Sequence, residues 1–277
     1  KSKLIVLSLA VCIATTIWGF LQTTPLLITS IGWDRSYQYL TSLMGGAFAL
    51  MFGGFFVNQI SKHFNLNIYA IGAGIATCIV ILAAAIWPLI VTIWIAIASY
   101  VLGIWFLRLL RINVVKVTSI SAFLVGACLY GTAVGLAAHY PINYPGLYGL
   151  ALVVPILLGR RSILTAMQSL QQYLIPSAET RYLDIAILLI ALVHFTVSLM
   201  PEVGFDALAT HLFIPGHLAS QHEWGFNADT YVWAVMPALG DWLFSLGYML
   251  AGEQAARLIN VGFIFVLSWL SRDLAVW

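Results

Sequence analysis

The sequence predicts an all-α membrane protein: a bundle of about nine transmembrane helices with a cytoplasmic amino terminus and one long outer loop that carries amphipathic helices. The first observation is composition, because 62% of the 277 residues are hydrophobic and only 8% are charged, whereas soluble domains have about 25% charged residues. The second is the length of the charge-free runs: residues 68–107 and 117–159 contain no Asp, Glu, Lys or Arg. Since a helix needs about 20 apolar residues to cross a bilayer, each run holds a helical hairpin. The runs are apolar throughout rather than alternating, which excludes barrel strands.

The expected transmembrane helices follow one another along the whole chain, and Trp87-Pro88 marks the turn in the first hairpin. In order they are 4–24, 38–58, 68–87, 89–107, 118–139, 145–159, 183–200, 231–250 and 257–276. The more polar stretch 160–181 is expected to lie along the inner membrane surface as an amphipathic helix. It separates a front block, 1–159, of six spans from a rear block, 182–277, of three spans with the outer loop 201–230. Because the chain begins at Lys1 and ends at Trp277 in an apolar stretch, we expect it to be a piece of a longer protein.

The basic residues predict which way the chain is inserted. With the amino terminus inside, ten of the twelve Lys and Arg residues fall in cytoplasmic segments, which is the arrangement that the positive-inside rule favours. The ten are Lys1, Lys3, Lys62, Arg108, Arg111, Lys116, Arg160, Arg161, Arg181 and Arg257, and the two left outside are Arg35 and Arg272. A net charge of +2 without basic clusters predicts no nucleic-acid partner. Membrane lipids are the expected surroundings.

Small residues within the spans predict close helix packing. The pairs Gly45-Gly46 and Gly53-Gly54 and the Gly131-x-x-x-Gly135 motif let neighbouring backbones approach each other. Because such pairs are common in membrane helices, packing is favoured over a chemical role.

The segment 201–241 differs from the rest of the chain. It holds five of the ten acidic residues and three of the six histidines, but no Lys or Arg. Carboxylates and imidazoles gathered at a membrane surface suit acid/base or metal chemistry. The alternative is that any outer loop must be polar. The histidines follow a His-x5-His-x4-His spacing that matches no zinc signature, so a divalent metal remains an open possibility and no cofactor is established.

Two acids and one deep histidine stand out. Asp206 precedes an apolar helical pattern, so a helix on the membrane surface would expose its carboxylate at the first turn; the alternative is a simple N-cap. Asp241 follows Pro237, where a helix is expected to start, so its carboxylate either faces a cavity or stabilises the helix terminus. His194 lies in the middle of an expected span, where an interhelical hydrogen bond is favoured over a proton relay.

This part of the chain resembles the GT-C class of multi-spanning glycosyltransferases, which includes protein O-mannosyltransferases and bacterial transferases that use lipid-linked sugars. The resemblance covers residues 183–265 and rests on three segments in order. They are Gly204-Phe-Asp206-Ala-Leu-Ala-Thr-His211-Leu-Phe-Ile-Pro215, Met236-Pro-Ala-Leu-Gly-Asp241-Trp-Leu-Phe and Gly252-Glu-Gln-Ala-Ala-Arg257-Leu-Ile-Asn260. It implies an inverting enzyme of the bacterial inner membrane that moves a sugar from a polyprenyl phosphate to an acceptor hydroxyl at the outer face.

The resemblance also implies roles for individual residues. Asp206 would be the general base, Asp241 would position the acceptor or share a divalent metal, and His211 would orient Asp206 or touch the donor phosphate. Further loop residues are expected to bind substrate: Glu202, His217, His222 and Glu223.

Two departures from the family pattern leave other functions open. Thr210 stands where the family commonly has Tyr. A departing phosphate needs positive charge, but the expected topology leaves only Arg35 and Arg272 on the outer face. A metal or sequence beyond Trp277 would then supply the charge, or the transferase activity is absent. The alternatives are a non-catalytic subunit that packs against other membrane subunits, and a transporter.

Overall fold

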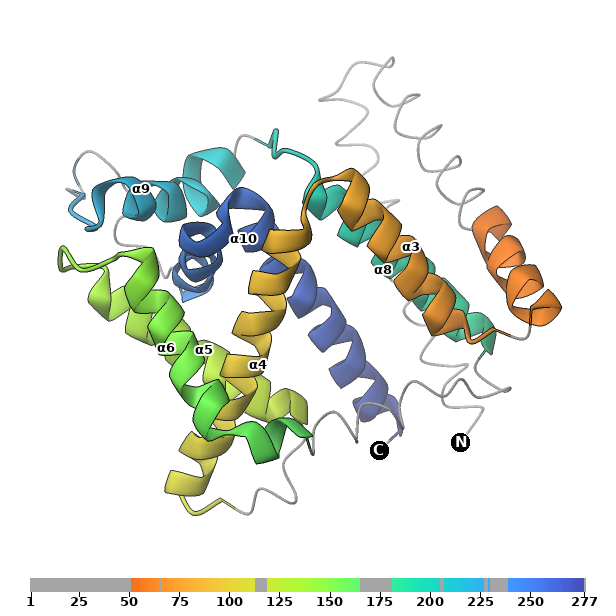
Figure 1. Cartoon of the computed structure of the whole chain (residues 1–277), viewed down its shortest axis with the longest axis horizontal. Coiled ribbons are helices and arrows are strands. Elements are labelled where there is room, and N and C mark those ends of the chain that lie inside the picture. The colour runs from red at the N-terminus through yellow and green to blue at the C-terminus, as the bar shows by residue number, and fades with distance from the viewer. Residues whose placement is uncertain are drawn as a thin grey trace, which may run out of the picture.

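The computed structural model describes residues 51–64, 66–112, 119–164, 181–204, 207–226, 229 and 239–276. Within these residues every regular element is a helix, so the all-α prediction is confirmed for this part of the chain. A helix at Met51–His63 comes first. It is followed by α3 (Ile68–Leu82), α4 (Ile86–Leu109), α5 (Ser119–Ala137), α6 (Pro145–Leu158), α8 (Arg181–Leu199), the π-helical turn η2 (Ala207–His211), α9 (Phe213–Gln221) and α10 (Leu239–Val276) (Figure 1).

Three of the described helices are long and apolar enough to cross a membrane: Ile86–Leu109, Ser119–Ala137 and Leu239–Leu267. A fourth candidate is the pair Met51–His63 and Ile68–Leu82, which bends by 118°. Helices α6 and α8 are apolar but shorter. The expected span 4–24 and most of the expected surface helix 160–181 lie outside the described residues.

The turn between α3 and α4 comes earlier than expected. Helix α3 begins after Asn67, whose side chain accepts a hydrogen bond from the Tyr69 N–H at 2.9 Å. It ends at Leu82, and Ala84 turns the chain with a φ of 51°. Pro88 therefore lies in the first turn of α4, where its missing N–H costs no helical hydrogen bond.

The core forms where α4, α5 and α10 meet, and glycines set the spacing between them. Gly103 of α4 and Gly126 of α5 lie so close to the opposite backbone that a Cβ on either would fall within 1.8 Å of a carbonyl oxygen. Gly131 and Gly135 of α5 lie against Leu239 and Trp242 at the start of α10. The predicted packing role of the Gly131-x-x-x-Gly135 motif is thus confirmed. Gly45 and Gly46 lie outside the described residues.

Helix α10 is broken near one third of its length. At Gly252 the backbone takes φ 76° and ψ −167°, a conformation that only glycine adopts readily. The break frees the Leu250 carbonyl, which accepts a hydrogen bond from the Trp87 indole N–H at 2.9 Å. Trp87 is the second residue of α4, so the break lies level with the start of that helix.

The first half of α10, residues 239–250, lies across one end of the bundle rather than through it. Its 12 residues extend about 18 Å, less than the thickness of about 30 Å of the hydrocarbon core. Its contacts with Gly131 and Gly135 fall in the second half of α5, and its contact with Trp87 falls in the first turn of α4. Figure 1 shows this half beside α9, and the second half running from the break to the far end of the bundle.

The predicted topology separates two residues that lie in contact in the structure. The sequence placed Arg257 and Glu202 on opposite membrane faces, but Arg257 Nη2 lies 3.3 Å from Glu202 Oε2. The two residues therefore lie at the same end of the bundle, and the membrane face on which they lie stays a prediction.

Candidate functional site

The segment that follows α8 includes the short helix η2, which lies against the start of α10. This contact brings the His211 side chain to that of Asp241. His211 ends η2, and its Nδ1 lies 2.7 Å from Asp241 Oδ1 in the first turn of α10. The Asp241 side chain is 11% exposed and that of His211 is 57% exposed. In the tautomer with the proton on Nδ1, the ionised Asp241 carboxylate accepts this hydrogen bond and Nε2 is the ring nitrogen outside it. Asp206 lies outside the described residues, so its expected contact with His211 stays a prediction.

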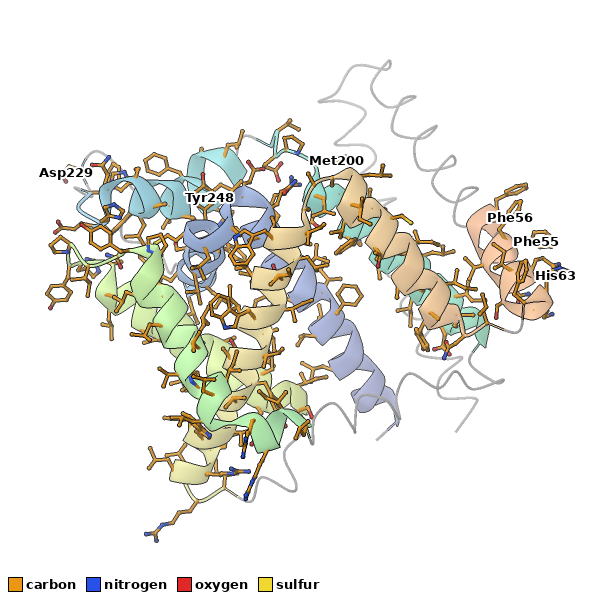
Figure 2. All side chains as sticks on the ribbon, in the orientation of Figure 1. Phe55, Phe56, His63, Met200, Asp229 and Tyr248 are labelled. Atoms are coloured by element: carbon orange, nitrogen blue, oxygen red, sulfur yellow. The ribbon has the colours of Figure 1, made fainter. Side chains whose placement is uncertain are left out.

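His211 lines a cleft of about 370 Å³ between α8 and the second half of α10. The residues that line the cleft include three with charged or amide side chains, Glu202, Arg257 and Asn260. The other residues that line it are His194, Val197, Ser198, Leu212, Phe244, Ala256, Val261 and Ile264. His194 is exposed and contributes to this lining, five residues before the end of α8. Figure 2 places Met200, which follows α8, on the same end of the molecule as Tyr248 of the first half of α10.

Arg257 is held at the cleft by two carboxylates and one carbonyl. Its Nη2 donates to the Val197 carbonyl at 3.0 Å, and its Nη1 lies 3.7 Å from Glu253 Oε1. The guanidinium is only 14% exposed, yet Nη1 makes no hydrogen bond within the described structure. Sequence reasoning missed this residue because it assigned Arg257 to an inner loop. The spacing of Glu253 and Arg257, four residues apart on one helix, was the available signal.

Glu202 positions Arg257. Its Oε1 accepts hydrogen bonds from the N–H groups of Val203 at 2.9 Å and Gly204 at 2.8 Å, while its own N–H donates to Glu253 Oε1 at 2.7 Å. The Gly204 hydrogen bond is the main cause that lowers the pKa of Glu202; burial opposes it, and Val203 and Arg257 add to it. Glu202 is therefore an ionised partner of Arg257 at neutral pH.

The remaining predicted substrate-binding residues lie outside the lining of this cleft. His217 packs among Phe213, Trp224 and Phe226, and burial lowers the pKa of its imidazole. Glu223 is exposed on the surface. Their expected contact with a substrate stays a prediction.

His222 has a structural position. It ends α9 with a φ of 60°, stacks on Tyr144 at 4.1 Å and contacts the Asn143 carbonyl through Nδ1 at 2.9 Å. The fully buried Asn143 amide in turn donates to the carbonyls of Ala137, Tyr140 and His222. These bonds fix α9 to the loop between α5 and α6, and they leave His222 outside the cleft.

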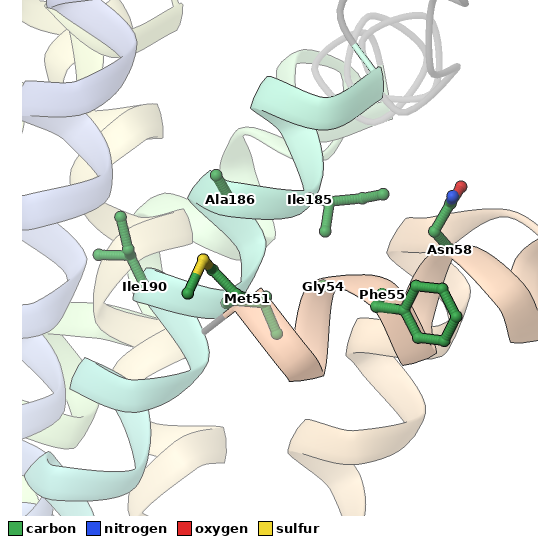
Figure 3. Close-up of a pocket in the computed structure, with 8 residues that line it drawn as sticks. Met51, Gly54, Phe55, Asn58, Ile185, Ala186 and Ile190 are labelled. Carbon is green, nitrogen blue, oxygen red and sulfur yellow. The ribbon is translucent and has the colours of Figure 1, made fainter. Parts of the chain in front are cut away.

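The described residues contain no group of three or more His, Cys, Asp or Glu side chains that could hold a metal ion. A larger cavity, about 550 Å³, lies between the helix Met51–His63 and α8. Figure 3 shows Met51, Phe55, Ile185 and Ile190 around it, with Asn58 at the edge. This cavity is apolar and offers little for chemistry, whereas the smaller cleft has acidic, basic and imidazole groups.

No protein family, curated protein or solved structure matches the chain.

Proposed function

We propose that the chain is a membrane glycosyltransferase, or part of one, that moves a sugar from a polyprenyl phosphate to an acceptor hydroxyl. The observation that carries this proposal is that His211, backed by Asp241, and the buried Arg257 line or flank one cleft at the end of the bundle. The resemblance of residues 183–265 to GT-C enzymes gives the reaction type. The Arg257 guanidinium at this cleft supports the proposal, because the reaction leaves a phosphate that needs positive charge.

The reaction assigns a task to each group. The acceptor oxygen attacks the anomeric carbon and gives its proton to the Asp206 carboxylate, with inversion at that carbon. The bond between this carbon and the phosphate oxygen breaks, and the polyprenyl phosphate leaves with the electron pair. Asp241 accepts the Nδ1 proton of His211, which fixes the ring so that Nε2 can contact substrate.

In this proposal, Arg257 is the cation that stabilises the negative charge of the leaving phosphate. Its Nη1 makes no hydrogen bond within the described structure and is buried, so donation to a phosphoryl oxygen requires the guanidinium to shift toward the cleft. Glu202 and Glu253 hold the guanidinium in place.

We propose that the cleft faces the non-cytoplasmic side, in the inner membrane of a bacterium. In a topology in which the first half of α10 does not cross the membrane, Arg257 lies on the outer side. Arg272, near the far end of α10, then lies on the inner side. The number of basic residues on the inner side is ten in both topologies, because Arg272 replaces Arg257 there. The positive-inside rule thus supports this orientation as well as it supported the nine-span one.

The broken helix also bears on the transporter alternative. Transporters often bind substrates where helices are interrupted near the bilayer midplane. Here the interruption lies beside Trp87 at the start of α4, which favours a site at the membrane surface. We therefore prefer the transferase.

Purified chain in lipid, supplied with radiolabelled polyprenyl-phosphate sugars and acceptor lipids, tests the proposal. Asp206→Asn should lower transfer by about 10²–10⁴-fold, and Arg257→Gln should lower it as well. Asp229→Asn is the matched control, because it makes the same change at an exposed acid of the same loop and should transfer as the wild type does. Equal transfer by wild type and Asp206→Asn would refute the assigned base. Absence of transfer with every donor would favour a non-catalytic subunit.

A further inference from the structure

Four arginines gather at the end of the bundle opposite the cleft. Arg108 and Arg111 lie at the end of α4, and Arg160 and Arg161 follow α6; all four are exposed. We call this group the basic end. Arg108 is 21 residues from Trp87 along α4, which corresponds to about 32 Å, so the basic end lies at the other membrane surface from the cleft.

The two pairs of arginines belong to adjacent helices. A Cβ on Gly159, just before Arg160, would lie 2.2 Å from Val101 of α4. Val101 is seven residues before Arg108, so the two pairs lie within about two helical turns of each other in height. The side chains of Arg108 and Arg160 can therefore reach one bound molecule.

Helices α4, α5 and α6 contain no carboxylate that could pair with these arginines. Between Asp34 and Glu179 the sequence contains no Asp or Glu, so α4, α5, α6 and their loops have only basic charges. Any anion that pairs with Arg108 or Arg160 therefore comes from outside those helices.

Large apolar side chains are exposed around the same arginines. Leu109 is 78% exposed and Leu158 is 71% exposed, and both adjoin an arginine pair. Exposed leucines beside arginines do not suit an acidic soluble partner, whose surface is polar. They suit a phospholipid, because the arginines can contact its phosphate and the leucines its acyl chains.

We propose that the basic end binds an anionic phospholipid, with the headgroup phosphate between Arg108 and Arg160. The inference is independent of the proposed transferase. The competing explanation is that these arginines only fix the orientation of the chain and stabilise helix C-termini. In that case the purified protein would not distinguish between anionic and zwitterionic lipids.

Native mass spectrometry of the purified chain in mild detergent tests the proposal, with dioleoyl phosphatidylglycerol and dioleoyl phosphatidylcholine as probes. The wild type should retain phosphatidylglycerol in preference to phosphatidylcholine. The double variant R108Q/R160Q should weaken phosphatidylglycerol binding about 25-fold, since each basic residue near a lipid surface contributes about fivefold, or about 1 kcal/mol. R108K/R160K keeps the charges and should retain most of the binding.

Lys62→Gln is the matched control, because Lys62 is an exposed basic residue of a different helix. This variant should bind phosphatidylglycerol within about twofold of the wild type. Equal retention of the two lipids by the wild type would overturn the proposal. So would unchanged binding in R108Q/R160Q, or a loss in Lys62→Gln as large as that in the double variant.

Discussion

Replacing Gly126 with alanine should force α4 and α5 apart. A Cβ at Gly126 would lie 1.7 Å from the Ser99 carbonyl oxygen, whereas carbon–oxygen contacts begin at about 3.3 Å, so the helices must separate by about 1.6 Å. Backbone atoms cannot rotate out of the way as a side chain can. We therefore expect the upper end of the usual overpacking cost, about 3 kcal/mol, which corresponds to a fall of about 6–12 °C in melting temperature.

The assay is thermal unfolding of purified protein in one detergent, followed by helical circular dichroism. Gly74→Ala is the matched control, because Gly74 is also within a helix but has nothing within 4 Å of an added Cβ. It should melt at or slightly above the wild-type temperature, since alanine is the better helix former. Gly103→Ala should resemble Gly126→Ala, and the double variant should cost much less than the sum, because both methyl groups enter the same gap. Melting of Gly126→Ala within about 2 °C of Gly74→Ala would refute the close packing of α4 on α5.

Two further predictions concern the cleft and its orientation. Because the pKa of Glu202 is lowered in the folded protein, the stability that its carboxylate contributes is present above its ordinary pKa of 4.5 and is lost as the pH falls through the lower folded value. The melting temperature should therefore fall below pH 4.5 and fall less steeply in Glu202→Gln; an identical pH dependence in both would contradict the Arg257 and backbone contacts of Glu202. In a background without Cys12, Cys78 and Cys128, an impermeant thiol reagent should label Asp229→Cys and Arg272→Cys from opposite sides of the membrane. Labelling of both from one side would favour the original nine-span topology.

Much of the helical framework could be predicted from charge-free runs. The expected span 89–107 corresponds to α4, 118–139 to α5 and 145–159 to α6. All three are confirmed as helices, and α4 and α5 are also long and apolar enough to cross a membrane, because lipid exposure selects apolar residues over the whole length of a helix. The boundary near Trp87-Pro88 was displaced because proline is tolerated in a first turn and therefore does not mark a break by itself.

The candidate site was predicted only in part. His211 and Asp241 were both singled out for their chemistry, but the spacing of 30 residues between them could not show that they touch. Their contact depends on η2 and α9 returning the chain to the bundle. The role of His222 in binding substrate stays a prediction, and its observed contacts are structural: it lies at the C-terminal cap of α9 and contacts a loop carbonyl.

Arg257 shows why a count of charges could not give the topology. The nine-span arrangement and the arrangement with a half-helix exchange Arg257 and Arg272 between the two membrane faces, so both leave ten basic residues inside. The half-helix arrangement is instead argued from two long-range contacts: the Leu250 carbonyl with the Trp87 indole, and Arg257 with Glu202. Each bond joins residues more than 50 positions apart, and both require the chain to turn at Gly252. The glycine that ends the half-helix therefore determines whether a basic residue reaches the cleft.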